Sequence, residues 1–254
     1  MRSLIKETHV LDLQRRMEAV ELLKLLKERY TYEELHDLTG LPITVLNRYV
    51  KGHVLPSRNR AEELFKLFNE KFSLEEEIVR RIRFDERGYF DNTALLSDTL
   101  LLRLIAKVVA GKFSNEEVTA VFTAAVDGIP IAAHVANVLD ARLVYAKRER
   151  EVGIDKFIEE TYIPSFSGMI MTLYVPKNAL SPKDNVLIVD DIIRTGETQK
   201  ALFKMAEKAG SKIVGIFFMV SIGEKWRQTV EIPEDCKLEI LVRLPEPGEQ
   251  AEET

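Results

Sequence analysis

The sequence predicts an α/β protein in which an all-helical N-terminal domain precedes a domain built on a parallel sheet. Apolar stripes at helical spacing, each ended by Gly or Pro, occupy roughly the first 80 residues. From residue 118 short apolar runs alternate with helical segments, which is the order of parallel βαβ units. The run at residues 186–189 is wholly apolar, as expected of a strand covered on both faces.

Composition limits the class of protein. The chain has 254 residues and a net charge of −5, with charged residues of both signs, so any nucleic-acid site must be local. The single cysteine, Cys236, excludes an intrachain disulfide framework and favours a reducing cytoplasm. No run of apolar residues is long enough for a membrane span, and residues 1–10 lack the apolar core of a signal peptide.

The helical region carries clear start and stop signals. Thr31 followed by Glu34 forms a capping box, and Gly40 ends the helix that it starts. Pro42 opens the next helix at its first turn. The helices predicted in this region are residues 17–28, 32–38, 43–50 and 60–72, followed by a helix and linker over residues 73–87.

Two short helices joined by a tight Gly turn form a helix-turn-helix, and residues 31–57 resemble the Cro/repressor-like helix-turn-helix family. Residues 41–60 contain four Lys or Arg and no Asp or Glu, which favours an anionic partner such as duplex DNA. Ile43, Leu46 and Val50 are expected to face the core. The residues expected to contact DNA are Thr44, Asn47, Arg48, Lys51, Ser57 and Arg58. The alternative is a helical protein-interaction domain with a solvated basic face.

The second domain begins after a linker at residues 84–91 with a long amphipathic helix at residues 94–110. A flexible loop is expected over residues 151–167. Its predicted strands are residues 118–122, 142–146, 168–175, 186–189, 212–220 and 237–244, with helices at residues 131–139 and 199–210. The predicted domains are residues 1–84 and 85–244, followed by an acidic disordered tail at residues 245–254.

The chemistry of the chain is concentrated after the apolar run at residues 186–189. Asp190 and Asp191 come next, and a Thr-Gly-Glu-Thr loop leads into a helix. Free N–H groups in such a loop bind phosphate, and Thr hydroxyls add donors. Two neighbouring carboxylates suit the vicinal hydroxyls of a ribose, so the residues predict a ribose 5-phosphate site.

This stretch closely resembles the phosphoribosyl pyrophosphate (PRPP) signature of type I phosphoribosyltransferases. The resemblance implies a PRPP-binding fold, with Mg²⁺ accompanying PRPP and no other cofactor. Arg194 departs from the pattern, because the family usually has a small residue there. The residues expected to bind the ribose and its 5-phosphate are Asp190, Asp191, Arg194, Thr195, Gly196, Glu197 and Thr198.

The loop after the first strand resembles the pyrophosphate loop of the same enzymes, and the matching residues are Ala125, Val126, Asp127 and Gly128. Asp127 departs from relatives that have Lys or Arg, and a carboxylate about 4 Å from pyrophosphate would repel it by roughly 4 kcal/mol. Lys147 and Arg148 match basic residues that reach the pyrophosphate; the alternative is a solvated charge run.

The base site is the least defined part of the prediction. Lys225 and Trp226 follow a predicted strand at the ligand end of the sheet, where purine relatives place a Lys and aromatic residues. Phe217 or Phe218 are alternatives for stacking on the base. The middle region, through residues 173–180, resembles the xanthine phosphoribosyltransferase and bacterial purine-repressor branch.

The order of the two domains resembles archaeal helix-turn-helix/phosphoribosyltransferase-like regulators of the GfcR type. This resemblance implies a cytoplasmic homodimer that binds promoter DNA, with PRPP or a nucleoside monophosphate as its effector and no membrane association. No catalytic residue is assigned, and the four scattered His residues predict no metal-ligand cluster. The alternative is an active purine phosphoribosyltransferase with an accessory DNA-binding domain. A purely structural interaction protein would leave the ribose-phosphate signature unexplained.

Overall fold

The computed structural model describes residues 9–165 and 168–247. The chain divides into two compact units, and the division falls inside a short helix, α5 (Leu74–Arg80), between Glu77 and Ile78. Most of the acidic tail predicted from the sequence lies outside the described residues. Over the described ranges, no helix is both long and apolar enough to cross a membrane.

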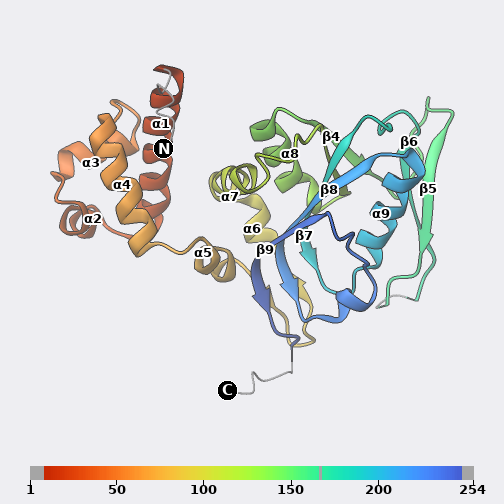
Figure 1. Ribbon diagram of the computed structural model, residues 1–254. Helices are drawn as coiled ribbons and strands as arrows, with labels where there is room; N and C mark the ends of the chain where they lie inside the picture. The colour runs from red at the N-terminus through yellow and green to blue at the C-terminus, as the bar shows by residue number, and fades with distance from the viewer. Residues whose placement is uncertain (1–8, 166–167, 248–254) are drawn as a thin grey trace. The chain divides into compact units, whose positions relative to one another are not determined.

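The first unit is helical, as predicted; its helices begin and end within about two residues of the expected positions, except the first, which begins eight residues before residue 17. They are α1 (His9–Arg29), α2 (Tyr32–Thr39), α3 (Ile43–Val50) and α4 (Arg58–Lys71) (Figure 1). The capping box is confirmed: the Thr31 hydroxyl accepts from the Glu34 N–H at 3.2 Å, and the Thr31 N–H donates to the Glu34 carboxylate at 2.7 Å. Gly40 ends α2 with a φ of +66°, a conformation that favours Gly.

The core of this unit is made by leucines that share helix faces. Leu23 on α1, Leu35 on α2 and Leu46 on α3 are fully buried. Ile43 was predicted to face this core, but its side chain is 39% exposed. It lies on the same side of α3 as Leu46, but it is the first residue of the helix, where its side chain is less covered than that of Leu46 one turn later.

The segment predicted as a linker, residues 84–91, is ordered and belongs to the second unit. It forms a hairpin of β1 (Arg83–Phe84) and β2 (Phe90–Asp91), whose turn is closed by the Asp85 N–H donating to the Tyr89 carbonyl at 2.9 Å. The single helix predicted at residues 94–110 is instead two, α6 (Thr93–Ser97) and α7 (Thr99–Lys112). The break occurs at Asp98, whose side chain caps α7 by accepting from the Leu101 N–H at 2.9 Å.

The second unit is built on a five-stranded sheet that is parallel throughout. The strands are β3 (Ala120–Ala124), β4 (Arg142–Ala146), β7 (Asn185–Ile193), β8 (Lys212–Ile222) and β9 (Lys237–Leu244). Their spatial order is β4-β3-β7-β8-β9. The chain moves one way from β3 to β4 and the other way from β7 to β9, so the strand order reverses between β3 and β7. Open α/β sheets bind ligands at this switch point, beyond the carboxyl ends of the strands.

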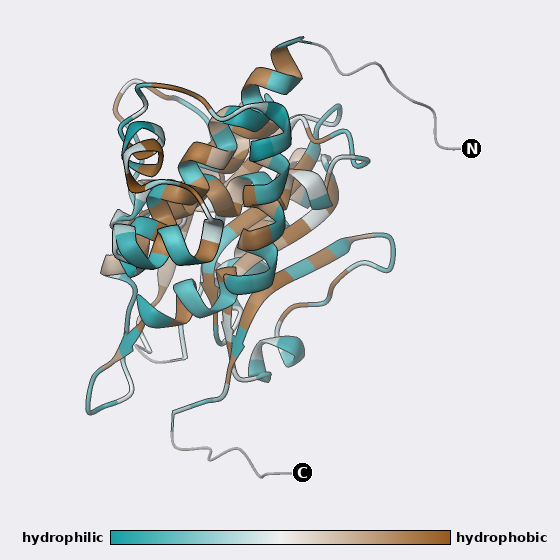
Figure 2. Cartoon of the chain, turned by 90° about the vertical axis from the view of Figure 1, so that its left-hand side faces the viewer, coloured by the Kyte–Doolittle hydropathy of each residue, from teal (hydrophilic) through white to brown (hydrophobic). Residues whose placement is uncertain are grey.

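Helices cover both faces of the sheet (Figure 1). On one face lies α8 (Gly128–Leu139), packed against α7; on the other lies α9 (Glu197–Ala209), packed against β5 (Phe157–Tyr162). β5 pairs antiparallel with β6 (Met171–Pro176), so the loop predicted at residues 151–167 contains a strand. In Figure 2 the sheet strands are largely hydrophobic, whereas the helices change from hydrophobic to hydrophilic around their axes.

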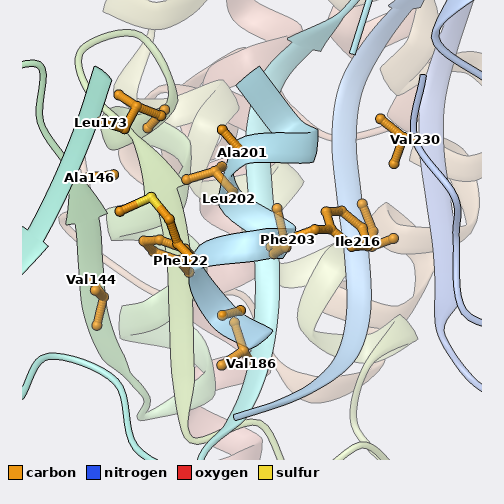
Figure 3. Close-up of a cluster of buried hydrophobic side chains, with 14 of the residues drawn as sticks. Phe122, Val144, Ala146, Leu173, Val186, Ala201, Leu202, Phe203, Ile216 and Val230 are labelled. Carbon is orange, nitrogen blue, oxygen red and sulfur yellow. The ribbon is translucent and has the colours of Figure 1, made fainter. Parts of the chain in front are cut away.

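The core beneath α9 includes side chains of three adjacent strands, which explains why these apolar runs are continuous. Leu202 and Phe203 of α9 pack against Phe122 of β3, Val186 of β7 and Ile216 of β8, all buried (Figure 3). A strand with a helix on each face needs apolar side chains at successive positions, which is the pattern read at residues 186–189.

Substitution of Leu46 tests the packing of α3. Leu46→Ala should lower the free energy of unfolding of the helical unit by about 2–5 kcal/mol, because a fully buried leucine leaves a cavity. Ile43→Ala, on the same helix, should cost less than about 1 kcal/mol, because its side chain is partly exposed. Urea unfolding followed by circular dichroism measures both, and equal losses would contradict the burial described for α3.

Candidate functional site

A cavity of about 390 Å³ lies at the switch point, beyond the carboxyl ends of β3 and β7. Three segments line most of it: the hairpin end with Tyr89, Phe90 and Asn92, the loop Ala124–Gly128, and the end of β7 with the loop that follows. The cavity therefore gathers both sequence motifs predicted to bind PRPP, together with a hairpin that sequence reasoning did not include.

Asp190 and Asp191 belong to β7, which continues through both residues to Ile193. Successive side chains of a strand point to opposite faces, so the two carboxylates have different neighbours. Asp190 accepts from the Gln199 amide at 2.8 Å and from the Thr123 hydroxyl at 3.5 Å. Asp191 accepts from the side-chain amide of Asn92, which reaches it from the segment after the hairpin.

The surroundings of Asp190 and Asp191 disfavour the negatively charged form of both carboxyl groups. Both residues are 5% exposed. Burial, reinforced by the charge of Asp191, raises the pKa of Asp190 well above its ordinary range. Burial also raises the pKa of Asp191 to about 6, with a further contribution from the charge of Asp127. The negative charge of Asp127 therefore repels the charge of Asp191. The adverse charge that the sequence placed in the pyrophosphate loop thus lies at the cavity.

Close backbone approach around the cavity depends on two glycines. A Cβ on Gly128 would lie 2.1 Å from the Thr123 hydroxyl and 2.2 Å from an Asp190 carboxylate oxygen, so only Gly lets α8 start here. Gly196 has a φ of +87° at the start of α9, and a Cβ there would lie 2.8 Å from Val230. The backbone of both loops therefore faces the cavity with helix N-termini behind it, which is favourable for phosphate.

In the loop at residues 195–198, called here the phosphate loop, some side chains line the cavity and others do not. Thr195 and Thr198 line the cavity, and the Thr198 hydroxyl donates to the Tyr162 hydroxyl at 3.3 Å. Glu197 does not line it; its carboxylate accepts from the Ser165 hydroxyl. Of the predicted loop residues, Glu197 is the one that the structure turns away from the ligand space.

The basic residues after β4 also separate. Arg148 lines the cavity. Lys147 instead pairs with Glu151 at 2.9 Å and lines a different groove, between β4 and β6. The hydrogen bond to Glu151 raises the pKa of Lys147. The structure thus supports Arg148, and not Lys147, as a residue within reach of a pyrophosphate in this cavity.

The predicted base residues are not in the cavity. Trp226 is fully buried and packs beneath Gly196, where its ring cannot stack on a base. Lys225 is exposed but does not line the cavity, and the alternatives Phe217 and Phe218 are buried within β8. Large aromatic side chains beside a sheet are more often buried in the core than exposed to a ligand, and Trp226, Phe217 and Phe218 follow this preference.

The aromatic rings that do line the cavity are Tyr89 and Phe90 of the hairpin. Tyr89 is 58% exposed, which leaves its ring accessible. Sequence reasoning missed both because they lie in a segment read as a linker. The short hairpin has only two residues in each strand, too few for an alternating pattern to appear.

The residues predicted to contact DNA lie in the helical unit. Thr44, Asn47 and Arg48 are on α3, and Lys51 is its C-cap. Thr44, Arg48 and Lys51 are exposed, whereas Asn47 is half-buried. Ser57 and Arg58 are exposed at the start of α4, where the Ser57 hydroxyl already accepts from the Arg60 N–H at 3.4 Å as a helix cap.

A divalent cation is chemically compatible with the cavity, although the described residues contain no group of three or more His, Cys, Asp or Glu placed to hold one. Mg²⁺ usually binds through one or two carboxylates together with phosphate oxygens and water. Asp190 and Asp191 supply such carboxylates at the ligand space. A cation brought with a pyrophosphate would offset the repulsion among these carboxylates and Asp127.

Comparison with known proteins identifies the second unit. Residues 91–242 match the family model described as "Phosphoribosyl transferase domain". The chain belongs to this family. Its membership accounts for the parallel sheet and for a cavity at the switch point of that sheet.

The similar curated proteins include both regulators and enzymes. The chain is 28% identical over 142 residues to the probable purine biosynthesis transcriptional regulator PurR of Streptococcus pneumoniae, covering 56% of this chain and 52% of the relative. It is 32% identical over 124 residues to the xanthine phosphoribosyltransferase of Streptococcus mitis, covering 48% of this chain and 76% of the enzyme. The chain thus spans about half the length of the regulator that it matches.

Solved structures agree on the fold. Adenine phosphoribosyltransferase from Rhodothermus marinus has a TM-score of 0.59 and 26% identity, covering 67% of this chain and 98% of the enzyme. The enzyme from Giardia lamblia, complexed with 9-deazaadenine, has a TM-score of 0.60 and 23% identity, covering 68% of this chain and 98% of that one. These enzymes share the architecture of the phosphoribosyl transferase family member described here.

Substitution of Asp191 tests the electrostatics of the cavity. The raised pKa means that the folded protein binds more protons than the unfolded one between pH 3.8 and about 6, so stability falls as pH rises through this window. Asp191→Asn should therefore stabilise the ligand-free protein at pH 7. The upper limit is roughly 3 kcal/mol, because each pH unit in that window is worth about 1.4 kcal/mol.

Thermal denaturation of both proteins between pH 3.5 and 7.5 measures this effect. The stability difference should disappear below about pH 4 and reach its full value above about pH 6. As a comparison, Asp127→Asn should move the window to lower pH, because it removes a charge that raises the pKa of Asp191. A variant Asp191→Asn that is less stable than the wild type at pH 7 would contradict this electrostatic description.

Proposed function

We propose that this chain is a DNA-binding transcription regulator whose phosphoribosyltransferase domain senses PRPP or a purine nucleotide. One observation carries the proposal: a helix-turn-helix with an exposed basic face is joined in one chain to a cavity suited to ribose 5-phosphate. The similarity of part of the chain to a purine biosynthesis regulator supports the same reading.

The basic face of α3 supports a polyanionic partner. Arg48 and Lys51 are exposed, and within the described part of the chain neither makes an ion pair. A protein of net charge −5 that leaves such cations unneutralised on one helix offers them to an anion. In duplex DNA, Arg48 and Asn47 are suited to base edges and Lys51 to a phosphate.

The cavity supports an effector with a phosphorylated ribose. The N–H groups of the loop at residues 195–198 and the hydroxyls of Thr195 and Thr198 are suited to a 5-phosphate. Asp190 and Asp191 can accept hydrogen bonds from ribose hydroxyls, which would lessen the penalty for their burial. PRPP and nucleoside monophosphates share this ribose 5-phosphate, and Mg²⁺ would accompany PRPP.

We further propose that the chain acts in the cytoplasm as a homodimer of the archaeal GfcR type. A dimer presents two recognition helices to half-sites on one duplex, which is the usual geometry of helix-turn-helix readers. The effector would act by preferring one state of the dimer over another, as linkage requires.

A second candidate function is catalysis by a purine phosphoribosyltransferase that carries an accessory DNA-binding unit. The similarity to xanthine phosphoribosyltransferases favours this reading. Asp127 weighs against fast turnover, because a carboxylate in the pyrophosphate loop repels the leaving group that such an enzyme must stabilise. Both functions require the same ribose-phosphate loop, so the loop does not discriminate between them.

Arg48 provides the test of DNA reading. Arg48→Ala should abolish sequence preference for promoter DNA and reduce the salt dependence of binding, because one cation and one base-reading group are lost. Gel-shift titrations and footprints at several salt concentrations measure both effects. Lys24→Ala removes a positive charge from an exposed position on α1 and serves as the matched control. An unchanged footprint with Arg48→Ala would refute α3 as the recognition helix.

Binding and turnover of PRPP separate the two functions. Calorimetry with PRPP, Mg²⁺ and a panel of nucleoside monophosphates should show binding that Thr198→Ala weakens about tenfold, the value of one hydrogen bond to a charged group. Thr161→Ala, outside the cavity lining, should bind like the wild type. Steady PRPP consumption with adenine, guanine, hypoxanthine or xanthine would favour the enzyme instead.

A further inference from the structure

Arg194 connects three segments that are far apart in the sequence. Its guanidinium donates to the Glu246 carboxylate from Nη2 at 2.7 Å and from Nε at 3.1 Å. Its Nη1 donates to the Gly88 carbonyl at 3.3 Å. The end of β7, the segment after β9 and the turn of the β1–β2 hairpin are therefore held together by one side chain.

The surroundings are shaped to admit this ion pair. Glu246 is 8% exposed, although the sequence predicted it to lie in a disordered tail. Gly223 has a φ of +59°, and a Cβ there would lie 2.7 Å from the Glu246 Cγ. Gly88 has a φ of +75°, and a Cβ there would lie 3.1 Å from the Pro247 Cβ. The carboxylate thus fits against backbone that has no side chain in its way.

The same hairpin reaches both ends of the ligand cavity. Arg194 directly precedes the phosphate loop and holds Gly88. Asn92, just after the hairpin, donates to Asp191 in the region suited to the ribose. Tyr89 and Phe90 lie between these two contacts and line the cavity. Because Asn92 also lines the cavity, a ribose hydroxyl that donates to Asp191 approaches a carboxylate that already holds the Asn92 amide, so the ligand and the segment after the hairpin share this group.

We propose that Arg194 is a positioning residue that pins the hairpin turn to the phosphate loop, so that a ligand that binds Asp191 and alters its contact with Asn92 moves the hairpin about this fixed point. The inference rests on the proposed function, because it supplies the route by which an occupied cavity alters the chain near the helical unit. The hairpin begins at Arg83, six residues after Glu77, the last residue of that unit. Glu246 keeps Arg194 oriented toward the hairpin.

This role differs from that of a direct phosphate ligand. The Glu246 carboxylate already neutralises the guanidinium, so a 5-phosphate on the loop meets hydroxyls and N–H groups with little added net charge. A pinning role requires both partners of the ion pair. A direct role requires Arg194 alone, and loss of Glu246 would then strengthen phosphate binding. If Arg194 pins the hairpin, Arg194→Gln and Glu246→Gln have the same effect on the response to ligand. If Arg194 binds the phosphate directly, they have opposite effects on phosphate affinity.

The experiment uses the full chain with PRPP and Mg²⁺, and measures hydrogen exchange of residues 83–91 together with the effect of PRPP on DNA affinity. In the wild type, PRPP should change hairpin exchange severalfold and shift DNA affinity by about 5- to 150-fold, the usual range of allosteric coupling. In Arg194→Gln and Glu246→Gln both responses should be lost, and in Glu246→Gln, whose side chain does not line the cavity, PRPP affinity should stay within roughly tenfold of the wild type. Arg243→Gln removes an exposed charge from β9 and should respond normally.

The remaining outcomes decide against the inference in distinguishable ways. Full coupling in both variants overturns it, as does PRPP affinity lost in Arg194→Gln but kept or raised in Glu246→Gln. If the variants do not fold, wild-type exchange still decides, because PRPP binding without any change at residues 83–91 overturns the pinning role. Wild-type protein that binds no PRPP overturns the proposed function itself and this inference with it.

Discussion

Two carboxylates buried side by side at the end of β7 set the conditions for the rest of this structure. Charged groups at 5% exposure are unfavourable without partners, and Asp190 and Asp191 also repel each other. Three side chains donate hydrogen bonds to them: Gln199 from α9 and Thr123 from β3 to Asp190, and Asn92, just after the hairpin, to Asp191. Gly128 leaves the space in which Asp190 fits. Four separate segments are thus arranged around these two buried, mutually repelling carboxylates.

This arrangement links stability to occupation of the cavity. Anything that donates hydrogen bonds to the carboxylates, or brings a cation to them, binds the folded state and not the unfolded one, and so stabilises the fold. The raised pKa values of Asp190 and Asp191 reflect their burial and the negative charges beside them. A ligand that supplies donors or a cation to this pair would therefore change the energy of every segment that contacts it.

Local patterns predicted the elements of the fold more reliably than the contacts between them. The capping box at Thr31, the helix Ile43–Val50 and the strand Lys237–Leu244 agree with the sequence because their signals lie within a few residues. The position of the acidic pair and of the loop after it, between a strand and a helix, was also predicted, because these residues form one continuous motif. The pairing of Arg194 with Glu246 spans 52 residues, and no periodicity connects such distant positions.

The residues predicted for the base site lie outside the cavity for a related reason. Sequence alone does not show whether an aromatic residue after a strand turns inward or outward, because that depends on what packs above it. Trp226 turns inward because Gly196 leaves room over it, whereas Tyr89 is accessible on a hairpin with little core of its own. Trp226, which the sequence favoured, is fully buried, whereas Tyr89 and Phe90, which it did not indicate, line the cavity.

Arg194 shows how one departure from a motif can alter the character of a site. A cation beside a phosphate loop would ordinarily strengthen anion binding, but here Glu246 neutralises it. The ligand phosphate is then left to N–H dipoles and hydroxyls, whose attraction is short-ranged and only weakly screened by salt. The exposed cations of α3 face the opposite case, because their attraction to a polyanion is strongly screened. Under the proposed function, one chain combines a salt-tolerant site for a small anion with a salt-sensitive surface for a large one, and ionic strength should separate binding of the two.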